Sequence, residues 1–247
     1  MLFPHHENEA AQCRCAYGDE LAQIWLHNGF VKIDGEKMSK SLNNSFFVKD
    51  ALKEFCAEAL RFYLLQTHYS GDFNYAVSDL ESAKKRRDKF YRLKKRLGVL
   101  EFADYELNLK SNSKGFQSEL SRQILNALSD DLNISLALSV FDEFIINSNA
   151  KLDENPKDKA LKENLTQGLK ECALIFGVGF MQTSEYFQFG VDDEFKAQIK
   201  AQILARNEAK AEKNFELADE IRTNLAKKGI ILQDTPNGTV WEKSSES

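Results

Sequence analysis

The 247-residue chain is 43% apolar and 29% charged, so it can bury a core and is long enough for one large domain or two to three small ones. Its formal net charge of -5 argues against a dedicated polyanion binder, and no apolar run approaches the roughly 20 residues that cross a bilayer. The N-terminus lacks the basic and long apolar regions of a signal peptide, and four cysteines are too few for a disulfide framework. These features predict a cytoplasmic protein with no membrane partner.

Residues 1–72 predict short helices around a small strand region. Residues 5–16 favour a helix with Pro4 near its first turn. Residues 24–37 favour a strand, a tight turn and a loop. From 49 to 66 apolar residues recur at helical spacing, which predicts a single helix there.

Residues 73–185 predict a helical bundle joined by polar loops. Ser78, followed three residues later by Glu81, has the spacing of a capping box that opens a basic helix, and this helix is expected to end near Gly98. Three further helices are predicted at 117–128, 135–147 and 159–176, with a loop between the last two.

Residues 186–247 predict a small α+β domain. A long amphipathic helix is expected from about Val191 to Asn214, and Asn214 can cap a second helix that Gly229 stops. Two strands are predicted on either side of a Pro-Asn-Gly turn at 236–238. The whole chain is therefore expected to be mainly α with small α/β parts.

The loop Lys37-Met38-Ser39-Lys40-Ser41 is the strongest candidate for chemistry. Two lysines three residues apart, between a strand and a helix, can form a mobile clamp for anionic oxygens. An ammonium group placed there would stabilise the charge that develops when ATP loses pyrophosphate, and loop closure would make that help specific to the transition state. A solvated loop is the alternative, since short motifs match by chance.

His5 and Glu9 are four residues apart on the predicted first helix, so the imidazole and the carboxylate share one face. An imidazole and a carboxylate placed in this way could both bind one Zn²⁺. The alternative is an ordinary pair of side chains on the surface of a helix. Cys13 and Cys15 are expected not to be ligands, because the chain would have to fold back for them to reach the histidines.

Nine basic residues and one acid lie between Lys84 and Arg96. A helix so charged could follow the phosphates of an RNA, which give salt-dependent affinity without sequence information. It could equally be a solvated helix face, because the positive charge is not confined to one stripe.

Three stretches resemble the cysteinyl-tRNA synthetases, a family of class I aminoacyl-tRNA synthetases. The run WLHNGFVKIDGEKMSKSLNNSFFVKDAL is similar to their signature-loop region, and FPHHENEAAQ is similar to their zinc-binding helix. The run ARNEAKAEKNFELADEIRTNLAKKGIILQDTPNGTVWE resembles their anticodon-binding domain. The likeness is weakest in the middle bundle.

The resemblance implies ligation of cysteine to tRNA(Cys) with ATP, accompanied by Mg²⁺, as a monomer. It implies that Lys37 and Lys40 are catalytic and contact ATP together with His27. It also implies one Zn²⁺ per subunit, held by His5, Glu9 and two cysteines earlier in the family's sequence. Zinc would select cysteine because a soft thiolate binds it and a serine hydroxyl binds it poorly.

The resemblance further implies that the first region belongs to a Rossmann-like nucleotide-binding domain and that the bundle binds tRNA. It places an anticodon reader in the last region, where single-stranded bases are read by stacking and edge hydrogen bonds. Asp219 and Arg222 could instead form an ordinary helix ion pair. The residues expected to read the anticodon are Lys210, Phe215, Asp219, Arg222 and Asp234.

The chain departs from the family in lacking the His-Ile-Gly-His signature of the first half of the nucleotide-binding fold, and Asn43 stands where the family has Gly. We therefore expect a C-terminal fragment that is inactive alone. One alternative function is a non-catalytic tRNA-binding fragment. A second is a ligase of cysteine and an amino sugar, although those relatives lack the anticodon reader.

Overall fold

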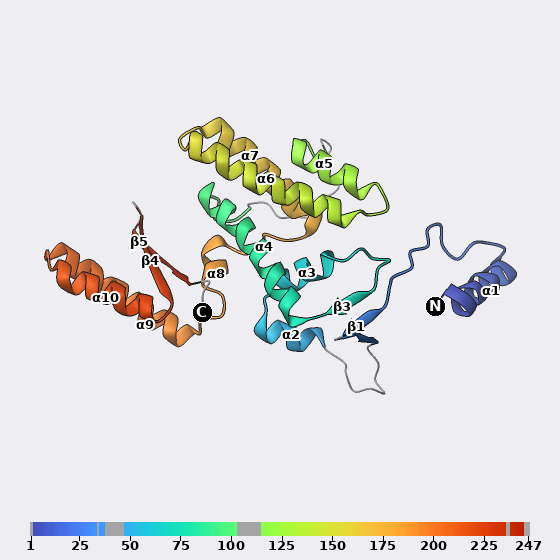
Figure 1. Cartoon of the computed structure of the whole chain (residues 1–247), viewed down its shortest axis with the longest axis horizontal. Helices are drawn as coiled ribbons and strands as arrows, with labels where there is room; N and C mark the ends of the chain where they lie inside the picture. Colours follow the sequence, from blue (N-terminus) through green and yellow to red (C-terminus); the bar gives the residue numbers. More distant parts are fainter. Residues whose placement is uncertain (1, 34, 38–46, 103–114, 236–237, 245–247) are drawn as a thin grey trace.

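The structure is a computed structural model that describes residues 2–33, 35–37, 47–102, 115–235 and 238–244. It is elongated, with the first helix at one end, helices packed around a small sheet in the middle, and a domain of two helices and a hairpin at the other end (Figure 1). Within the described residues no helix is both long and apolar enough to span a membrane. The mainly α fold with small strand regions is as predicted.

The first region holds an N-terminal helix and, apart from it, a three-stranded sheet. A π-helical turn, Leu2–His6, leads into α1, Glu7–Tyr17, and an extended stretch then leads to the sheet. Strand β1, Val31–Ile33, pairs antiparallel with β2, Glu36–Lys37, and parallel with β3, Phe73–Tyr75. The parallel partner β3 was not predicted.

The predicted single helix over 49–66 is wrong, because the structure has α2, Val48–Glu54, and α3, Ala57–Leu65. Phe55 and Cys56 between them have extended backbones, with ψ angles of 142° and 152°. The break directs the Cys56 thiol to the Arg87 guanidinium, which donates a hydrogen bond to it. Tertiary contact therefore overrides the local helical spacing here.

Close backbone packing joins the sheet to the loop before β3. The Gly29 amide donates to the Tyr69 carbonyl at 2.9 Å. A Cβ at Gly29 would lie only 2.1 Å from the carbonyl oxygen of Gly71. Glycine is required at 29 because another backbone, not a movable side chain, occupies that space.

The bundle consists of long helices that differ from the prediction at two ends. The capping box at Ser78 is wrong: α4 begins at Val77 after an extended Ala76, so Ser78 lies in the first turn and does not cap. Helix α6 runs on through the predicted loop because Ile145, Ser148 and Leu152 continue its buried face at helical spacing. The bundle helices are α4, Val77–Arg96; α5, Glu119–Leu128; α6, Ile134–Glu154; α7, Lys159–Phe176; and α8, Thr183–Phe187.

One hydrophobic core spans the sheet region and the bundle. Phe62 of α3, Phe90 of α4 and Phe141 of α6 are fully buried, and the Phe90 and Phe141 rings lie 5.8 Å apart. The core runs from Ala51 to Phe187, so α3 and α4 form one packed unit. The predicted domain boundary at residue 72 thus has core residues of one cluster on both sides, and the three-domain division stays a prediction.

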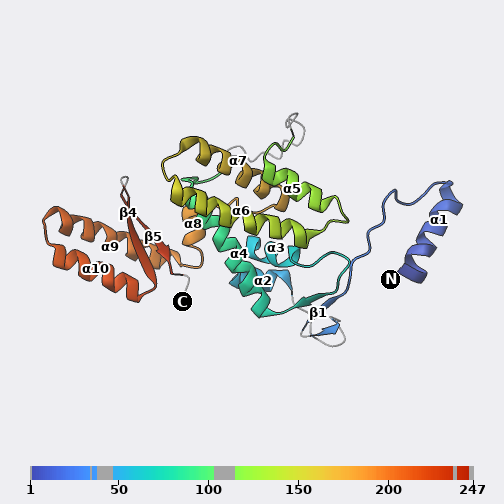
Figure 2. The ribbon, with the colours of Figure 1, turned by 45° about the horizontal axis from the view of Figure 1, so that its top comes forward.

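The last region has its own core, as expected for the small α+β domain. Helix α9, Asp193–Ala211, and α10, Phe215–Lys227, pack beside a hairpin of β4, Ile230–Thr235, and β5, Gly238–Lys243 (Figure 2). The Asn214 side chain accepts from the Leu217 amide at 3.2 Å, which confirms the predicted cap. The buried residues of this hydrophobic core are Val191, Ile199, Ile203, Leu225, Ile230, Leu232 and Trp241.

Polar contacts fix this region against the bundle. Lys95 near the end of α4 donates to the Gln233 side chain at 2.7 Å and forms an ion pair with Glu242. The Gln188 side chain, just after α8, donates to the carbonyl of Trp241 at 3.3 Å. The hairpin is thereby held next to α4 and α8.

Candidate functional site

The signature loop leaves the edge strand of the three-stranded sheet. Lys37 ends β2, opposite Lys32 of β1. Lys40 and Asn43 lie outside the described residues, so the contacts predicted for them stay predictions. The structure thus has a second short strand, β2, at Glu36–Lys37, where the sequence predicted the loop to follow the turn directly.

Asp72 and Asn74 hold β1 where it leads into the loop. Asp72 accepts hydrogen bonds from the Phe30 amide at 2.9 Å and from the Lys32 ammonium at 2.7 Å. The Lys32 hydrogen bond, followed by the Phe30 one, lowers the pKa of Asp72 below its usual value. Asn74 accepts from the Gly35 amide at 2.9 Å in the turn. The sheet therefore offers a fixed base at the point where the loop begins.

The structure brings His5 and Glu9 together on one face, with Nε2 of the imidazole 3.2 Å from Oε1 of the carboxylate. Both side chains are exposed, and both groups are ordinary zinc ligands. Among the described residues no third His, Cys, Asp or Glu joins them in a metal-binding group. Cys13 and Cys15 lie further along α1. The pair fits half of a four-ligand site.

His27 lies in a cluster with a second histidine and a tryptophan. Its Nε2 is 3.1 Å from Nδ1 of His6, and its ring stacks on Trp25 at 6.2 Å with an interplanar angle of 7°. Trp25 itself is 40% exposed. His6 was not singled out from the sequence, although its position next to the proposed ligand His5 was a usable signal.

The basic residues of α4 were expected to contact RNA phosphates or to form a solvated helix face. Neither description fits all of them. Lys94 is fully buried and donates to the carbonyls of Gly179 and Met181 at 3.0 and 2.8 Å. Arg86 forms a bidentate pair with Asp142 of α6. Arg87, Lys95 and Arg96 also contact other elements. Many of these cations therefore hold the fold together, and the rest lie on one exposed side. The exposed or half-buried cations on that side are Lys84, Lys85, Lys89 and Arg92.

In the last region the Asp234 carboxylate is already engaged. It accepts from Arg206 at 2.8 and 2.9 Å, from Lys210 at 2.7 Å and from the Thr239 hydroxyl at 2.8 Å. The Arg206 hydrogen bond, then those of Lys210 and Thr239, hold its pKa far below the usual value. The sequence analysis missed Arg206, whose i,i+4 spacing to Lys210 was a signal that the two share a face.

The other proposed base-reading residues follow one face of α10. Phe215, Asp219 and Arg222 are spaced four and three residues apart, and the Phe215 ring is 63% exposed. The alternative of an ordinary helix pair is not seen, since no ion pair within 4 Å joins Asp219 to Arg222, both of which the structure describes. An exposed ring beside an exposed carboxylate and an exposed guanidinium is a surface that can meet a planar polar ligand.

Family models match two segments of the chain. Residues 1–85 match the model described as tRNA synthetases class I (C) catalytic domain, and residues 123–181 match the DALR domain. The first match covers the zinc-helix pair, the histidine cluster, the sheet and the start of α4. The two matched segments therefore resemble parts of class I tRNA synthetases.

The sequence relatives make the family specific. The chain is 61% identical over 243 residues to a cysteine--tRNA ligase of Campylobacter jejuni, covering 98% of this chain and 52% of that protein. It is 59% identical to the enzyme of Campylobacter lari and 54% identical to that of Campylobacter hominis, covering 52% and 50% of them. The chain is thus similar over nearly its whole length to cysteine--tRNA ligases, and it spans about half the length of the curated relatives it matches.

A likeness to solved structures is weaker. A LeuRS–tRNA–LeuAMS complex from Agrobacterium radiobacter matches with a TM-score of 0.45 and 19% identity, over 66% of this chain and 23% of that one.

Proposed function

We propose that this chain takes part in the ATP-dependent ligation of cysteine to tRNA. In this reaction cysteine is activated to cysteinyl-adenylate and then transferred to tRNA(Cys). The observation that carries the proposal is the 61% identity, over nearly the whole chain, with a cysteine--tRNA ligase. The DALR match and the C-terminal hairpin domain favour a tRNA ligase over a ligase of cysteine and an amino sugar.

In the activation step Lys40, with Lys37, neutralises charge on the departing pyrophosphate of ATP, which is bound with Mg²⁺. A cation helps most when it meets this charge only in the transition state, and a loop hinged on a fixed strand can supply that selectivity. His27 contributes to the nucleotide pocket through the cluster that it forms with His6 and Trp25.

His5 and Glu9 would hold the zinc ion together with two cysteines that the family has earlier in its sequence. Bound zinc supplies a soft Lewis acid that selects the thiolate of the substrate over a hydroxyl. The convergence of Nε2 and Oε1 within 3.2 Å supports this pairing.

In the last region, Phe215 stacks a base of the anticodon, and Asp219, Arg222 and Lys210 contact its edges. The Asp234 carboxylate, which Arg206 holds in place, positions the Lys210 ammonium for this contact. The location in the cell, the monomeric state and the three-domain division stay predictions.

The decisive experiment compares this chain alone with the same chain mixed with the half of the Campylobacter jejuni relative that it does not cover. We expect tRNA binding without cysteine-dependent pyrophosphate exchange from the chain alone, and exchange from the mixture. Exchange that survives Lys40→Ala in the mixture would contradict the role of the loop. Failure of the wild-type chain to bind tRNA would remove the proposal for the last two regions.

A further inference from the structure

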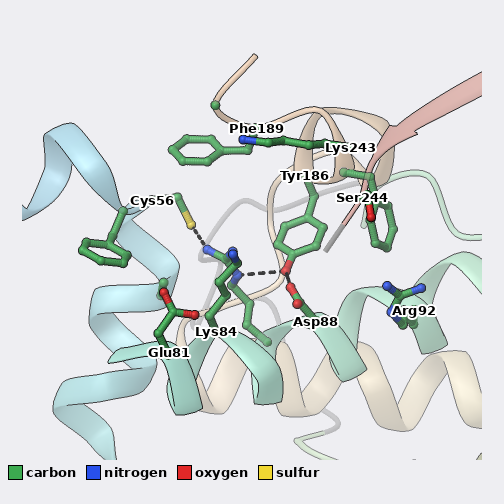
Figure 3. A pocket seen from close by; sticks show the side chains of 14 residues that line it. Cys56, Glu81, Lys84, Asp88, Arg92, Tyr186, Phe189, Lys243 and Ser244 are labelled. Atoms are coloured by element: carbon green, nitrogen blue, oxygen red, sulfur yellow. Dashed lines mark hydrogen bonds between the residues drawn. The ribbon is translucent and has the colours of Figure 1, made fainter. Parts of the chain in front are cut away.

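A pocket of about 250 Å³ lies where α3, α4, the segment after α8 and the end of β5 meet (Figure 3). Its walls come from parts of the chain that are more than 180 residues apart in sequence, from Phe55 to Ser244. None of the residues proposed above for ATP, zinc or anticodon contact lines it.

Positive charge dominates the walls of this pocket. Three cations come from α4, namely Lys84, Arg87 and Arg92, and a fourth, Lys243, comes from the end of β5. Two acids, Glu81 and Asp88, oppose them, and Asp88 accepts a hydrogen bond from the Tyr186 hydroxyl. The pocket therefore keeps a net positive charge in a chain whose total charge is -5.

Arg87 is the fixed part of the pocket. It is only 5% exposed, and its Nε donates to the Tyr186 hydroxyl at 3.0 Å while Nη1 donates to the Cys56 thiol. Its cation also lies 4.6 Å from the centre of the Tyr186 ring. These contacts occupy Nε and Nη1, and Nη2 has no hydrogen-bond partner among the residues that the structure describes. A buried guanidinium favours an acceptor for its remaining N–H groups.

Two lysines, Lys84 and Lys243, add further cations to the pocket. Within the described parts of the chain, neither Lys84 nor Lys243 has an ion-pair partner within 4 Å. Lys243 extends beside Phe189, and its ammonium lies close to Gly190, 3.7 Å from where a Cβ would be (Figure 3).

We propose that this pocket binds a phosphate group of the tRNA backbone, an inference that rests on the proposed tRNA binding. The Nη2 of a held guanidinium and two ammonium groups without ion-pair partners among the described residues match the oxygens of a phosphate. The aromatic wall of Phe55 and Phe189 gives the attached sugar an apolar surface. A phosphate bound here would touch α4 and β5 together, and so would join the bundle and the last domain to the same RNA strand.

A free phosphate or nucleotide has the same chemistry, so the test needs two arms. The double variant Lys84→Ala/Lys243→Ala removes both lysine cations of the pocket and leaves the buried Arg87 network in place. The matched control Lys157→Ala/Lys200→Ala removes equal charge from exposed positions outside the pocket. The first arm follows inorganic phosphate by ³¹P line broadening, and the second follows the affinity for tRNA over a series of salt concentrations.

We expect the pocket variant to weaken phosphate binding by about tenfold. We also expect it to lower the slope of log K against log salt for tRNA by about one, the value for one lost phosphate contact. The control should change neither. Equal phosphate binding by both variants would overturn the site. Loss of phosphate binding with an unchanged tRNA slope would overturn the RNA backbone as its source. If wild type bound no tRNA, the proposed function would fail while the phosphate arm still tested the pocket.

Discussion

The guanidinium of Arg206 lies almost fully buried against the half-exposed carboxylate of Asp234, joined to it by hydrogen bonds of 2.8 and 2.9 Å. This pair connects the middle of α9 to the end of β4, and Lys210 and Thr239 add further donors to the same carboxylate. A residue expected to read RNA is thus also a structural link within its own domain.

Asp234→Asn is expected to destabilise the last domain by about 1–3 kcal/mol, because it leaves a buried cation without a counter-charge. The figure is below that of a fully buried pair since the Asp234 side chain is 49% exposed. The pKa of Asp234 is lowered by the pairing, so the wild-type advantage should be present above the usual Asp pKa and fade as the pH falls below it. Urea unfolding at several pH values measures both effects, with the exposed Asp219→Asn as control; equal stability of the two variants would contradict the structural role.

Phe215→Ala is expected to weaken tRNA binding without loss of stability, since the ring is 63% exposed. Loss of one base–aromatic stack costs about 1–3 kcal/mol of binding, or roughly 5- to 150-fold in Kd. The control is Leu204→Ala on α9, an apolar side chain of the same exposed fraction. Binding measured at one fixed salt concentration separates them, and an unchanged Kd for Phe215→Ala would rule out the stacking role.

Burial lowers the pKa of the Lys94 ammonium to about 8, with Glu58 and Glu101 acting weakly in the opposite direction. Its pKa in the folded chain is then below the unfolded value of 10.5, so the unfolded chain binds the proton more tightly and the charge costs stability below pH 8. This cost should disappear as the pH rises from 8 to 10.5.

The stability of wild type relative to Lys94→Met is therefore expected to rise across that pH range, by at most about 1.4 kcal/mol per pH unit. Relative to the exposed control Lys89→Met, no such slope should appear. Denaturant unfolding at pH 7.5, 9 and 10.5 (roughly the window set by the shift) checks this. A flat or falling difference for Lys94→Met would mean that its ammonium is not desolvated.

Gly29→Ala is expected to disrupt the pairing of β1 with β3, because the new Cβ would meet backbone atoms of Gly71 and Asp72. Overpacking of this kind costs about 1–3 kcal/mol. Gly71→Ala is the matched control, since its Cβ would meet its nearest neighbour at 3.4 Å and would not force the backbones apart. Hydrogen exchange at the Phe73 amide, which donates to the Phe30 carbonyl, reports the local effect. Equal protection in both variants would show that the sheet can shift to make room.

The likeness to the cysteine--tRNA ligases, the order of most helices and the C-terminal hairpin could all be predicted from the sequence alone. Helix α7 begins and ends at the predicted residues because its signals are local: the Asp158 side chain accepts from the Leu161 amide, and Gly177 takes the left-handed conformation. The same holds for the Asn214 cap. Capping signals that involve only one or two helical turns can therefore be predicted from the sequence alone.

Other features depend on contacts between residues that are distant in the sequence, and these could not be predicted from local preferences. The break at Phe55 and Cys56 depends on Arg87, and the length of α6 depends on which face the bundle buries. Helix α4 gives the clearest case, because the spacing of its basic residues is compatible with either a solvated face or an RNA-binding face. Only the positions of Asp142, Gly179 and Glu242 divide its cations into those that hold the fold together and those that face the pocket. The sequence shows which residues are charged, but only the fold determines which residues they contact.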